Sequence, residues 1–277
     1  MNYERLIQEV IDEHKVSPID IMRTGDATNE YTYLNAHIDS YIKTVRDVDC
    51  LLADDKGRGS ILEIGSFLGP VSISLKRIGY SVCALDVPEF HRSSSLRSLF
   101  EKNGIRFDGL DLRQPQLPYE SNSFNAVIIC EVIEHLNFNP LPVLKEINRV
   151  LRPGGYIYVG MPNQSTVVNR LKLLLGKSIR DSIDHFSRQL DSNDNMIIWL
   201  HWREYTLSET IRLIETMGFE TIKKYYFVER VQWRSSVLKK MLKAVLYAYP
   251  SFRPNHVVIG RKGSAPVGEV WKKAANY

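Results

Sequence analysis

One short segment, Ser60-Ile-Leu-Glu-Ile-Gly-Ser-Phe-Leu-Gly69, constrains the fold of this chain more than any other. Its apolar residues predict a buried strand, and Gly65 and Gly69 permit a tight turn after that strand. Pro70 suits the first turn of a following helix. A strand, a turn and a helix in this order predict an α/β domain with a ligand lying across the turn.

Two acidic residues are placed to face this turn. Glu63 lies in the strand, and Asp86 ends the next apolar run, Tyr80-Ser-Val-Cys-Ala-Leu-Asp86. A carboxylate at this distance from a glycine turn can accept hydrogen bonds from ribose hydroxyls. Phe67 stands between the glycines, where its bulk would keep phosphate oxygens away from the backbone amides. The sequence therefore favours a nucleoside-type ligand over a pyrophosphate.

The chain alternates between strand-like and helix-like segments from residue 60 onward. Strands are expected at 60–65, 80–86, 105–111, 124–130, 156–161, 220–229 and 256–261, and helices at 69–78, 89–102, 140–151 and from 206 to 218. This alternation predicts a Rossmann-like doubly wound, mainly parallel seven-stranded sheet with its ligand at the carboxyl ends of the strands.

The same pattern divides the chain into regions. Residues 1–58 are expected to form an N-terminal helical cap with helices near 3–14 and 33–52, and 59–163 the ligand-binding core. The regular alternation then stops, which predicts a lid insertion over 164–205. Residues 206–262 complete the core around a basic helical insertion at 231–250, and 263–277 read as a tail.

Composition sets broad limits on the class of protein. Hydrophobic residues make up 44% and charged residues 25% of the chain, and the net charge is only +4. These values predict a globular domain and give little support to nucleic acid as a partner. The start of the chain is polar and no apolar run approaches the roughly 20 residues of a membrane span, so a cytoplasmic location is expected.

Further segments carry a family resemblance. Asp111 ends the third predicted strand, Glu131-Val-Ile-Glu-His135 follows the fourth, and a Pro-Gly-Gly turn precedes the fifth at Tyr156. Together with Ser60–Gly69, they resemble class I S-adenosylmethionine-dependent methyltransferases, including those of ubiquinone biosynthesis and those that methylate glycans or small molecules on oxygen. The resemblance implies S-adenosyl-L-methionine as cofactor and a small molecule or saccharide as substrate.

The resemblance also implies roles for individual residues at the cofactor. Asp86 would hold the ribose hydroxyls, Glu63 would lie near the methionine end, and Asp111 near the adenine amino group. Val87 and Leu112 would lie on either side of the adenine. The remaining implied cofactor contacts are Gly65, Ser66, Gly69, Cys130 and Glu131. The alternative for the carboxylates is that each caps the helix after its strand.

Two histidines are candidates for catalysis. His201 precedes the predicted helix that starts with the capping box Thr206-Leu-Ser-Glu209, where this family usually contacts substrate. Because histidine titrates near neutrality, His201 is the first candidate for a general base and His135 the second. The alternative is that both are structural.

A divalent-metal site is an alternative role for these histidines and for the glutamates near them. If a helix began at Glu131, then Glu131, Glu134 and His135 would share one face, and His201 could complete a set of divalent-metal ligands. This pattern is similar to that of metal-dependent RNA 2′-O-methyltransferases, which leaves such an enzyme as an alternative function. Metal is not favoured, because metal-free relatives carry the same segment. A non-catalytic cofactor-binding or interaction protein of the same fold is the other alternative.

Two basic amphipathic stretches, 169–177 and 234–249, lie outside the family pattern. Both place leucine and valine near lysines, as helices at a membrane interface do. A helix packed on the domain with solvated lysines is the ordinary interpretation. The sequence leaves lid support, homodimerisation and peripheral membrane contact open.

Overall fold

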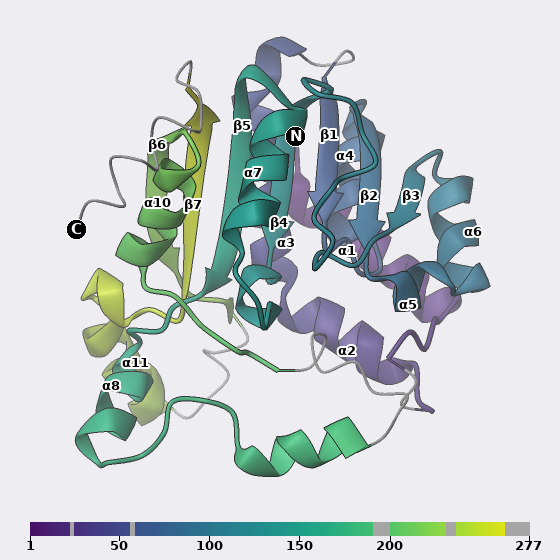
Figure 1. The fold of residues 1–277 in the computed structure, drawn as a ribbon. Helices are drawn as coiled ribbons and strands as arrows, with labels where there is room; N and C mark the ends of the chain where they lie inside the picture. Colours follow the sequence, from purple (N-terminus) through teal and green to yellow (C-terminus); the bar gives the residue numbers. More distant parts are fainter. Residues whose placement is uncertain (23–24, 56–58, 191–199, 231–236, 264–277) are drawn as a thin grey trace.

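The protein folds around one seven-stranded sheet (Figure 1). The computed structural model describes residues 1–277 except 23–24, 56–58, 191–199, 231–236 and 264–277. The spatial order of the strands is β3 (Arg106–Gly109), β2 (Ser81–Asp86), β1 (Ser60–Ile64), β4 (Phe124–Cys130), β5 (Leu151–Pro162), β7 (Asn255–Lys262) and β6 (Phe219–Phe227). β7 runs antiparallel to both of its neighbours, and the other neighbouring pairs are parallel. The predicted mainly parallel, doubly wound sheet is confirmed.

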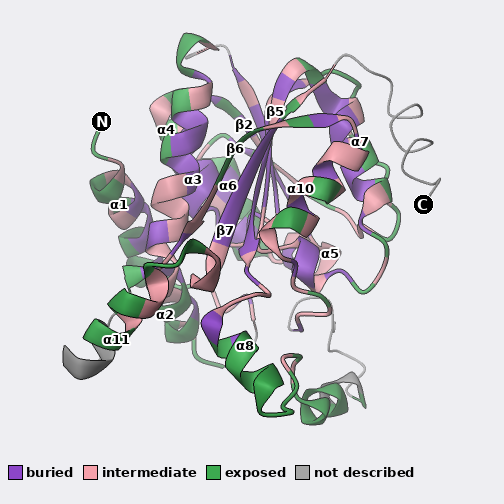
Figure 2. Ribbon diagram, turned by 90° about the vertical axis from the view of Figure 1, so that its left-hand side faces the viewer, coloured by how far each residue is buried: buried purple, intermediate pink, exposed green. Residues whose placement is uncertain are grey.

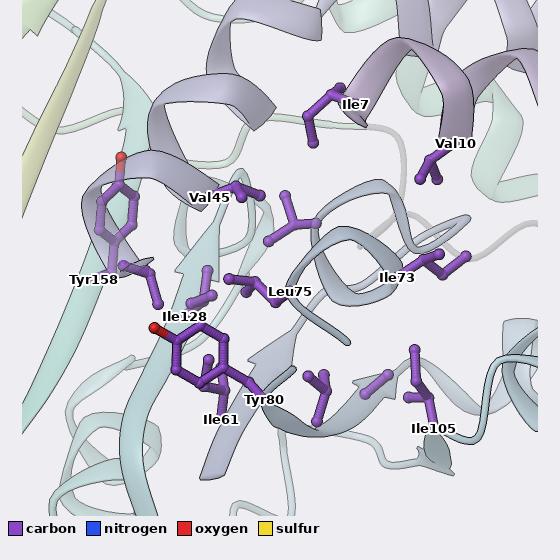
Figure 3. Close-up of a cluster of buried hydrophobic side chains, with 14 of the residues drawn as sticks. Ile7, Val10, Val45, Ile61, Ile73, Leu75, Tyr80, Ile105, Ile128 and Tyr158 are labelled. Atoms are coloured by element: carbon purple, nitrogen blue, oxygen red, sulfur yellow. The ribbon is translucent and has the colours of Figure 1, made fainter. Parts of the chain in front are cut away.

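Helices cover both faces of the sheet. On one face, α1 (Tyr3–Val16), α3 (Ile38–Leu51) and α4 (Pro70–Ile78) pack against one another. α6 (Ser94–Lys102) adds to this layer beside β3, and α7 (Leu141–Val150) and α10 (Leu207–Thr216) pack on the other face. Figure 3 shows how Ile7, Val45 and Ile73 from the first helix layer meet Ile61 and Ile128 from the strands. This apolar packing fixes the strand ends on which the site is built.

Several predicted elements differ in their bounds. The helix expected at 33–52 is two helices, α2 (Thr28–Ala36) and α3, joined at His37. The helix expected at 89–102 is also divided, into α5 (Pro88–His91) and α6, because the Ser93 side chain caps α6 by accepting the Leu96 amide. β5 starts at Leu151, so the Pro-Gly-Gly segment lies within the strand, beside a shift in its pairing with β4.

The region after β5 leaves the core and returns to it. It contains α8 (Val167–Leu174) and the 3-10 helix η3 (Ile183–Leu190) before α10 begins. α10 has the predicted capping box, in which the Thr206 and Glu209 side chains accept each other's backbone amides. α11 (Val237–Tyr247) and the short η5 (Pro250–Phe252) lie between β6 and β7. Of the basic insertion, 231–236 fall outside the described residues, as does the tail from 264.

The described residues also include two short 3-10 helices, η1 (Ala53–Asp55) and η2 (Ile133–His135). Among the described residues, no helix combines the length and the apolar character needed to cross a bilayer.

Candidate functional site

A cavity of about 590 Å³ opens at the carboxyl ends of the parallel strands. Its walls come from the ends of β1, β2 and β4, from the segment after β3, and from α2 and α3 of the N-terminal cap. Because β1 lies between β2 and β4, the glycine turn occupies the middle of this wall. The arrangement places a ligand at the strand ends, as the doubly wound fold predicts.

The glycine turn after β1 has a left-handed backbone at three positions. Gly65, Phe67 and Gly69 have φ values of 79°, 46° and 75°. A Cβ atom on Gly65 would lie 2.2 Å from Val132 Cγ2, so a side chain has no room there. Phe67 is the exception among these residues, since a left-handed conformation is costly for a residue with a Cβ.

Asp86 holds this turn in place. Its Oδ2 accepts the backbone amide of Phe67 at 2.7 Å, and its Oδ1 accepts the amide of Val87 at 2.8 Å. Burial raises the pKa of Asp86 to about 6, although the two amides act in the opposite direction. A carboxylate oxygen has room for a second hydrogen bond, so the group can also accept ligand hydroxyls in the cavity.

Glu63 and Ser66 add polar groups beside the turn. The Ser72 hydroxyl donates to Glu63 Oε2, and burial raises the pKa of Glu63 to about 8. Glu63 therefore holds its proton over much of the neutral range. The buried Ser66 hydroxyl has no hydrogen-bond partner among the described residues and lines the cavity, which leaves it available to a ligand.

The cavity wall beyond Asp86 is largely apolar. Val87, Phe90 and Leu112 contribute to it, as an aromatic base would require. Asp111 also lines the cavity, but its carboxylate is paired with the Arg113 guanidinium at 2.6 Å. That pairing lowers the pKa of Asp111.

Glu131 differs from the sequence expectation. Its φ is 53°, so no helix begins there, and the next regular element is η2 from Ile133. The expected helical face of Glu131, Glu134 and His135 is therefore wrong. Burial, and then the charge of Glu134, raise the pKa of Glu131 well above its usual range. Its side chain lines the cavity at the end of β4.

Glu134, His135 and His201 nevertheless meet in space. One side-chain ligand atom from each lies within 4.8 Å of the others, and the two imidazole rings are 4.7 Å apart. Glu134 is fully buried, and neither of its carboxyl oxygens has a hydrogen-bond partner in the described part of the chain. Burial raises the pKa of Glu134 to about 8.

The two histidines have different electrostatic surroundings. His135 Nδ1 lies 3.1 Å from the Leu200 carbonyl oxygen, and burial with the charge of His201 lowers its pKa to about 4. His201 Nδ1 lies 3.1 Å from Glu204 Oε1. Burial acts to lower the pKa of His201, but the Glu204 carboxylate outweighs it and raises that pKa. Both histidines use Nδ1 in these contacts, which directs Nε2 to other partners.

The N-terminal cap supplies residues that the sequence analysis did not single out. The Ser40 hydroxyl donates to Glu229 Oε1 at 3.0 Å, and His37 Nδ1 lies 3.2 Å from the same oxygen. Both residues and Glu229 line the cavity. Glu229 follows β6, 189 residues after Ser40, so no local spacing could have revealed this contact. The cap thus forms part of the site wall.

The comparisons with known proteins agree with this geometry. A family model described as a methyltransferase domain matches residues 62–159, from β1 to β5. The match includes the turn, Asp86 and the segment after β4. A curated relative from Mycolicibacterium smegmatis, described as a "probable S-adenosylmethionine-dependent methyltransferase", is 29% identical over 160 residues.

Residues 62–159 form a methyltransferase domain of the class I, S-adenosylmethionine-dependent type. The alignment with the M. smegmatis relative covers 58% of this chain and 51% of that protein. An uncharacterised protein of Methanocaldococcus jannaschii is 25% identical over 170 residues, which are 61% of this chain and 67% of that one.

Solved structures share the fold of this methyltransferase domain. An S-adenosylmethionine-dependent methyltransferase from Thermotoga maritima has a TM-score of 0.52 at 20% identity, over 85% of this chain and 96% of that one. Another, from Mesorhizobium loti, has a TM-score of 0.53 at 14% identity, over 82% and 98%. At these identities the likeness establishes the fold alone.

The residues present fit the family's cofactor, S-adenosylmethionine. The unpartnered Ser66 hydroxyl, the Asp86 carboxylate and the apolar wall at Val87 match a nucleoside in donors, acceptors and shape. Most of the sequence-predicted residues line one cavity: Glu63, Gly65, Ser66, Asp86, Val87, Asp111, Leu112, Cys130, Glu131, His135 and His201. Gly69 and Glu134 do not line it. Gly69 is the residue before α4, and a Cβ there would lie 2.9 Å from Phe100 Cε1.

Proposed function

We propose that this protein transfers a methyl group from S-adenosylmethionine to a hydroxyl oxygen of a small molecule or saccharide. The observation that carries the proposal is the His201–Glu204 pair, which lies beside the cavity that Asp86 and the glycine turn form. S-adenosylmethionine supplies an electrophilic methyl group on a sulfonium, and an alcohol attacks it better once its proton is removed.

Asp86 and Glu63 bind S-adenosylmethionine and orient it in the cavity. Asp86 accepts the ribose hydroxyls while its other lone pairs keep the backbone of Phe67 and Val87 fixed. Glu63 lies on β1, the strand that leads into the turn, and receives the methionine ammonium group. Because these partners are already fixed by the protein, little ordering remains to be done on binding.

His201 removes the acceptor proton. Glu204 accepts a hydrogen bond from His201 Nδ1–H, which leaves Nε2 as the basic atom and increases its basicity. His135, with its pKa lowered to about 4, stays neutral at pH 7 and does not compete for that proton.

Two substitutions test this assignment. His201→Ala should leave the affinity for S-adenosylhomocysteine nearly unchanged and lower kcat at least about 100-fold. Glu204→Gln should lower the pKa of His201, so the acid limb of the pH profile of kcat/KM should move to lower pH. The maximal kcat/KM should also fall. Unchanged turnover in His201→Ala would remove the residue as base.

A divalent metal ion is the second candidate for activating the acceptor. Glu134 has two buried, unpartnered oxygens, and the ligand atoms of Glu134, His135 and His201 cluster within 4.8 Å. The second ring nitrogen of each histidine contacts a carbonyl or carboxylate, as is usual for histidine ligands. Glu131 is not part of this cluster, although the sequence analysis placed it in the set. A bound cation would act as a Lewis acid and lower the pKa of an acceptor hydroxyl.

The metal candidate has its own experiment. Metal-stripped protein should bind Mn²⁺ or Zn²⁺ at one site, with Glu134→Gln weakening that binding at least about tenfold. Asp111→Asn, at a carboxylate that is paired with Arg113 and lies outside this cluster, serves as the matched control. Full activity after treatment with a chelator would reject the metal and leave His201 as the base.

The nature of the acceptor atom is tested with product analysis. Incubation with S-adenosylmethionine and separate panels of saccharides, phenols and primary amines, followed by mass spectrometry, should yield methyl ethers. Methylated amines as the sole products would show that the protein is an N-methyltransferase.

A further inference from the structure

The helix α8 exposes leucine instead of burying it. Its amino end is fixed to the domain, since Val167 and Asn169 are buried and the Asn169 side chain donates to the Gln164 carbonyl. Beyond this anchor, Leu171, Leu174 and Leu175 are 52%, 82% and 71% exposed. A soluble domain usually exposes such residues singly, so a run of them indicates a surface with a partner.

α11 repeats this exposure. Met241, Leu242 and Val245 are 64%, 58% and 73% exposed. Both helices contact η5, and the Arg170 guanidinium of α8 lies 5.3 Å above the ring of Phe252 in that element. Figures 1 and 2 place α8 and α11 at the same end of the molecule, beyond the end of β5, and Figure 2 colours most of α8 as exposed. The two helices, with η3, therefore form one apolar–basic end.

The two helices α8 and α11 carry charge of one sign, whereas η3 adds one acidic residue, Asp184. Residues 147–180, which include α8, contain no Asp or Glu, and neither do residues 230–262, which include α11. The sequence of α8 and its following turn contributes Arg170, Lys172 and Lys177, and that of α11 contributes Lys239, Lys240 and Lys243. Lys172 and Lys177 are exposed among the leucines of α8 and its following turn. Leucines interleaved with lysines suit an anionic lipid surface.

A second copy of the chain is a poorer match. A two-fold symmetric dimer through this end would bring the same basic surface of each copy together. The positive charges of α8 and α11 would repel one another, because neither helix carries an acidic residue. An anionic bilayer supplies both the apolar medium and the opposite charge.

The apolar–basic end is connected to the site. Phe186 of η3 stacks on Trp202 with their ring centroids 5.7 Å apart, and Asp181 Oδ2 accepts the His201 amide at 2.9 Å. Pro162, five residues before α8, and Asn255, three residues after η5, both line the cavity. A surface bound to this end would therefore lie next to the cavity.

We propose that α8, η3 and α11 dock the protein on an anionic lipid bilayer. The apolar side chains enter the interface between headgroups and acyl chains, and the lysines contact the headgroups. Where the proposed function also holds, the docked protein takes its acceptor from the membrane, as a lipid or a lipid-linked saccharide. The docking itself requires neither cofactor nor acceptor.

Co-sedimentation of the full chain with vesicles tests the proposal. Vesicles of phosphatidylcholine with roughly one third phosphatidylglycerol should sediment the protein, whereas pure phosphatidylcholine vesicles should bind it at least about tenfold less, and high salt should release it. Leu171→Gln combined with Leu174→Gln, or Lys172→Gln combined with Lys177→Gln, should each reduce binding at least about tenfold. Ile222→Gln, at an exposed apolar position on β6, is the matched control and should bind as the wild type does.

Three outcomes would overturn the proposal. The first is absence of the protein from sedimented anionic vesicles, and the second is equal binding to both kinds of vesicle. The third is a dimer in light scattering that the double leucine variant converts to a monomer, which would assign this end to a second copy. Binding of S-adenosylhomocysteine, measured in every variant, reports whether the domain is folded. Vesicle binding without any methyltransferase activity would refute the proposed function alone.

Discussion

The Asp86 carboxylate accepts the backbone amide of Phe67 at 2.7 Å, and Phe67 has the left-handed φ of 46°. From the sequence alone, Asp86 and Phe67 have separate expected roles, one as a ribose ligand and the other as an obstacle to phosphate. In the structure, one hydrogen bond joins them. Asp86 therefore has two tasks, because the group that faces the cavity also stabilises the strained turn beside it.

Removal of the Asp86 charge should weaken cofactor binding strongly. Hydrogen bonds to a charged group contribute about 1.5–3 kcal/mol, so Asp86→Asn should reduce the affinity for S-adenosylhomocysteine about 10- to 150-fold. Asp111→Asn is the matched control and should have a much smaller effect, because Asp111 is already paired with Arg113. Isothermal titration calorimetry measures both. Equal losses in the two variants would contradict the assignment of Asp86.

The affinity for S-adenosylhomocysteine should decrease at acidic pH. The pKa of Asp86 is raised to about 6 in the free protein, so the carboxylate is mainly charged above pH 6 and mainly protonated below it. A protonated Asp86 loses acceptor capacity toward ribose hydroxyls. The affinity for S-adenosylhomocysteine should therefore be nearly constant above this pKa and decline below it. Asp86→Asn should abolish that decline, and an unchanged pH profile in this variant would show that another group titrates.

Glu63 should release a proton when the cofactor binds. Its pKa is raised to about 8 by burial, so at pH 7 the free protein holds it mainly protonated. A methionine ammonium group beside it favours the carboxylate. Calorimetric titrations at pH 7 in phosphate and in Tris should give different binding enthalpies. The difference, divided by the difference between the ionisation enthalpies of the two buffers, should correspond to nearly one proton released per bound cofactor. In Glu63→Gln the difference should disappear, and its persistence would assign the proton elsewhere.

The strain at Phe67 predicts an unusual order of stability. Phe67→Ala removes the ring contacts with Tyr33 and Phe90 and keeps the left-handed strain, whereas Phe67→Gly removes the contacts and relieves the strain. The glycine variant should therefore unfold with a free energy about 1 kcal/mol higher than the alanine variant.

Phe90 is the matched control for this order. Phe90 packs against the ring of Phe67. It lies within the helix α5, where alanine is preferred over glycine by about 1 kcal/mol. Urea denaturation of all four variants should give opposite orders at the two positions. The same order at both would show that the turn at Phe67 is not strained.

Local sequence patterns were sufficient for the sheet and for most of the residues that line the cavity at its strand ends. Apolar runs, turn residues and the spacing from Gly69 to Asp86 depend on a few neighbouring residues, so the strands and the capping box at Thr206 could be predicted. Interruptions were harder to predict. The break at Ser93 depends on one capping side chain inside a segment with helical periodicity, and the break at His37 occurs without a side-chain cap.

The opposite wall of the site could not be derived from local patterns. Glu229 meets Ser40 only because the chain folds the end of β6 against α3. Glu131 leaves its strand with a left-handed φ, so the helical spacing that joined it to Glu134 does not apply. His135 and His201 approach each other from elements 66 residues apart. The exposed leucines of α8 have the same pattern as buried ones, and only the fold distinguishes the two cases.

The most direct test of the account is calorimetric titration of the purified protein with S-adenosylmethionine and S-adenosylhomocysteine. The structure predicts that both bind at one site, that Asp86→Asn weakens both, and that His201→Ala weakens neither. Absence of binding by either compound at millimolar concentration would contradict the central claim that this cavity is a methyl-donor site.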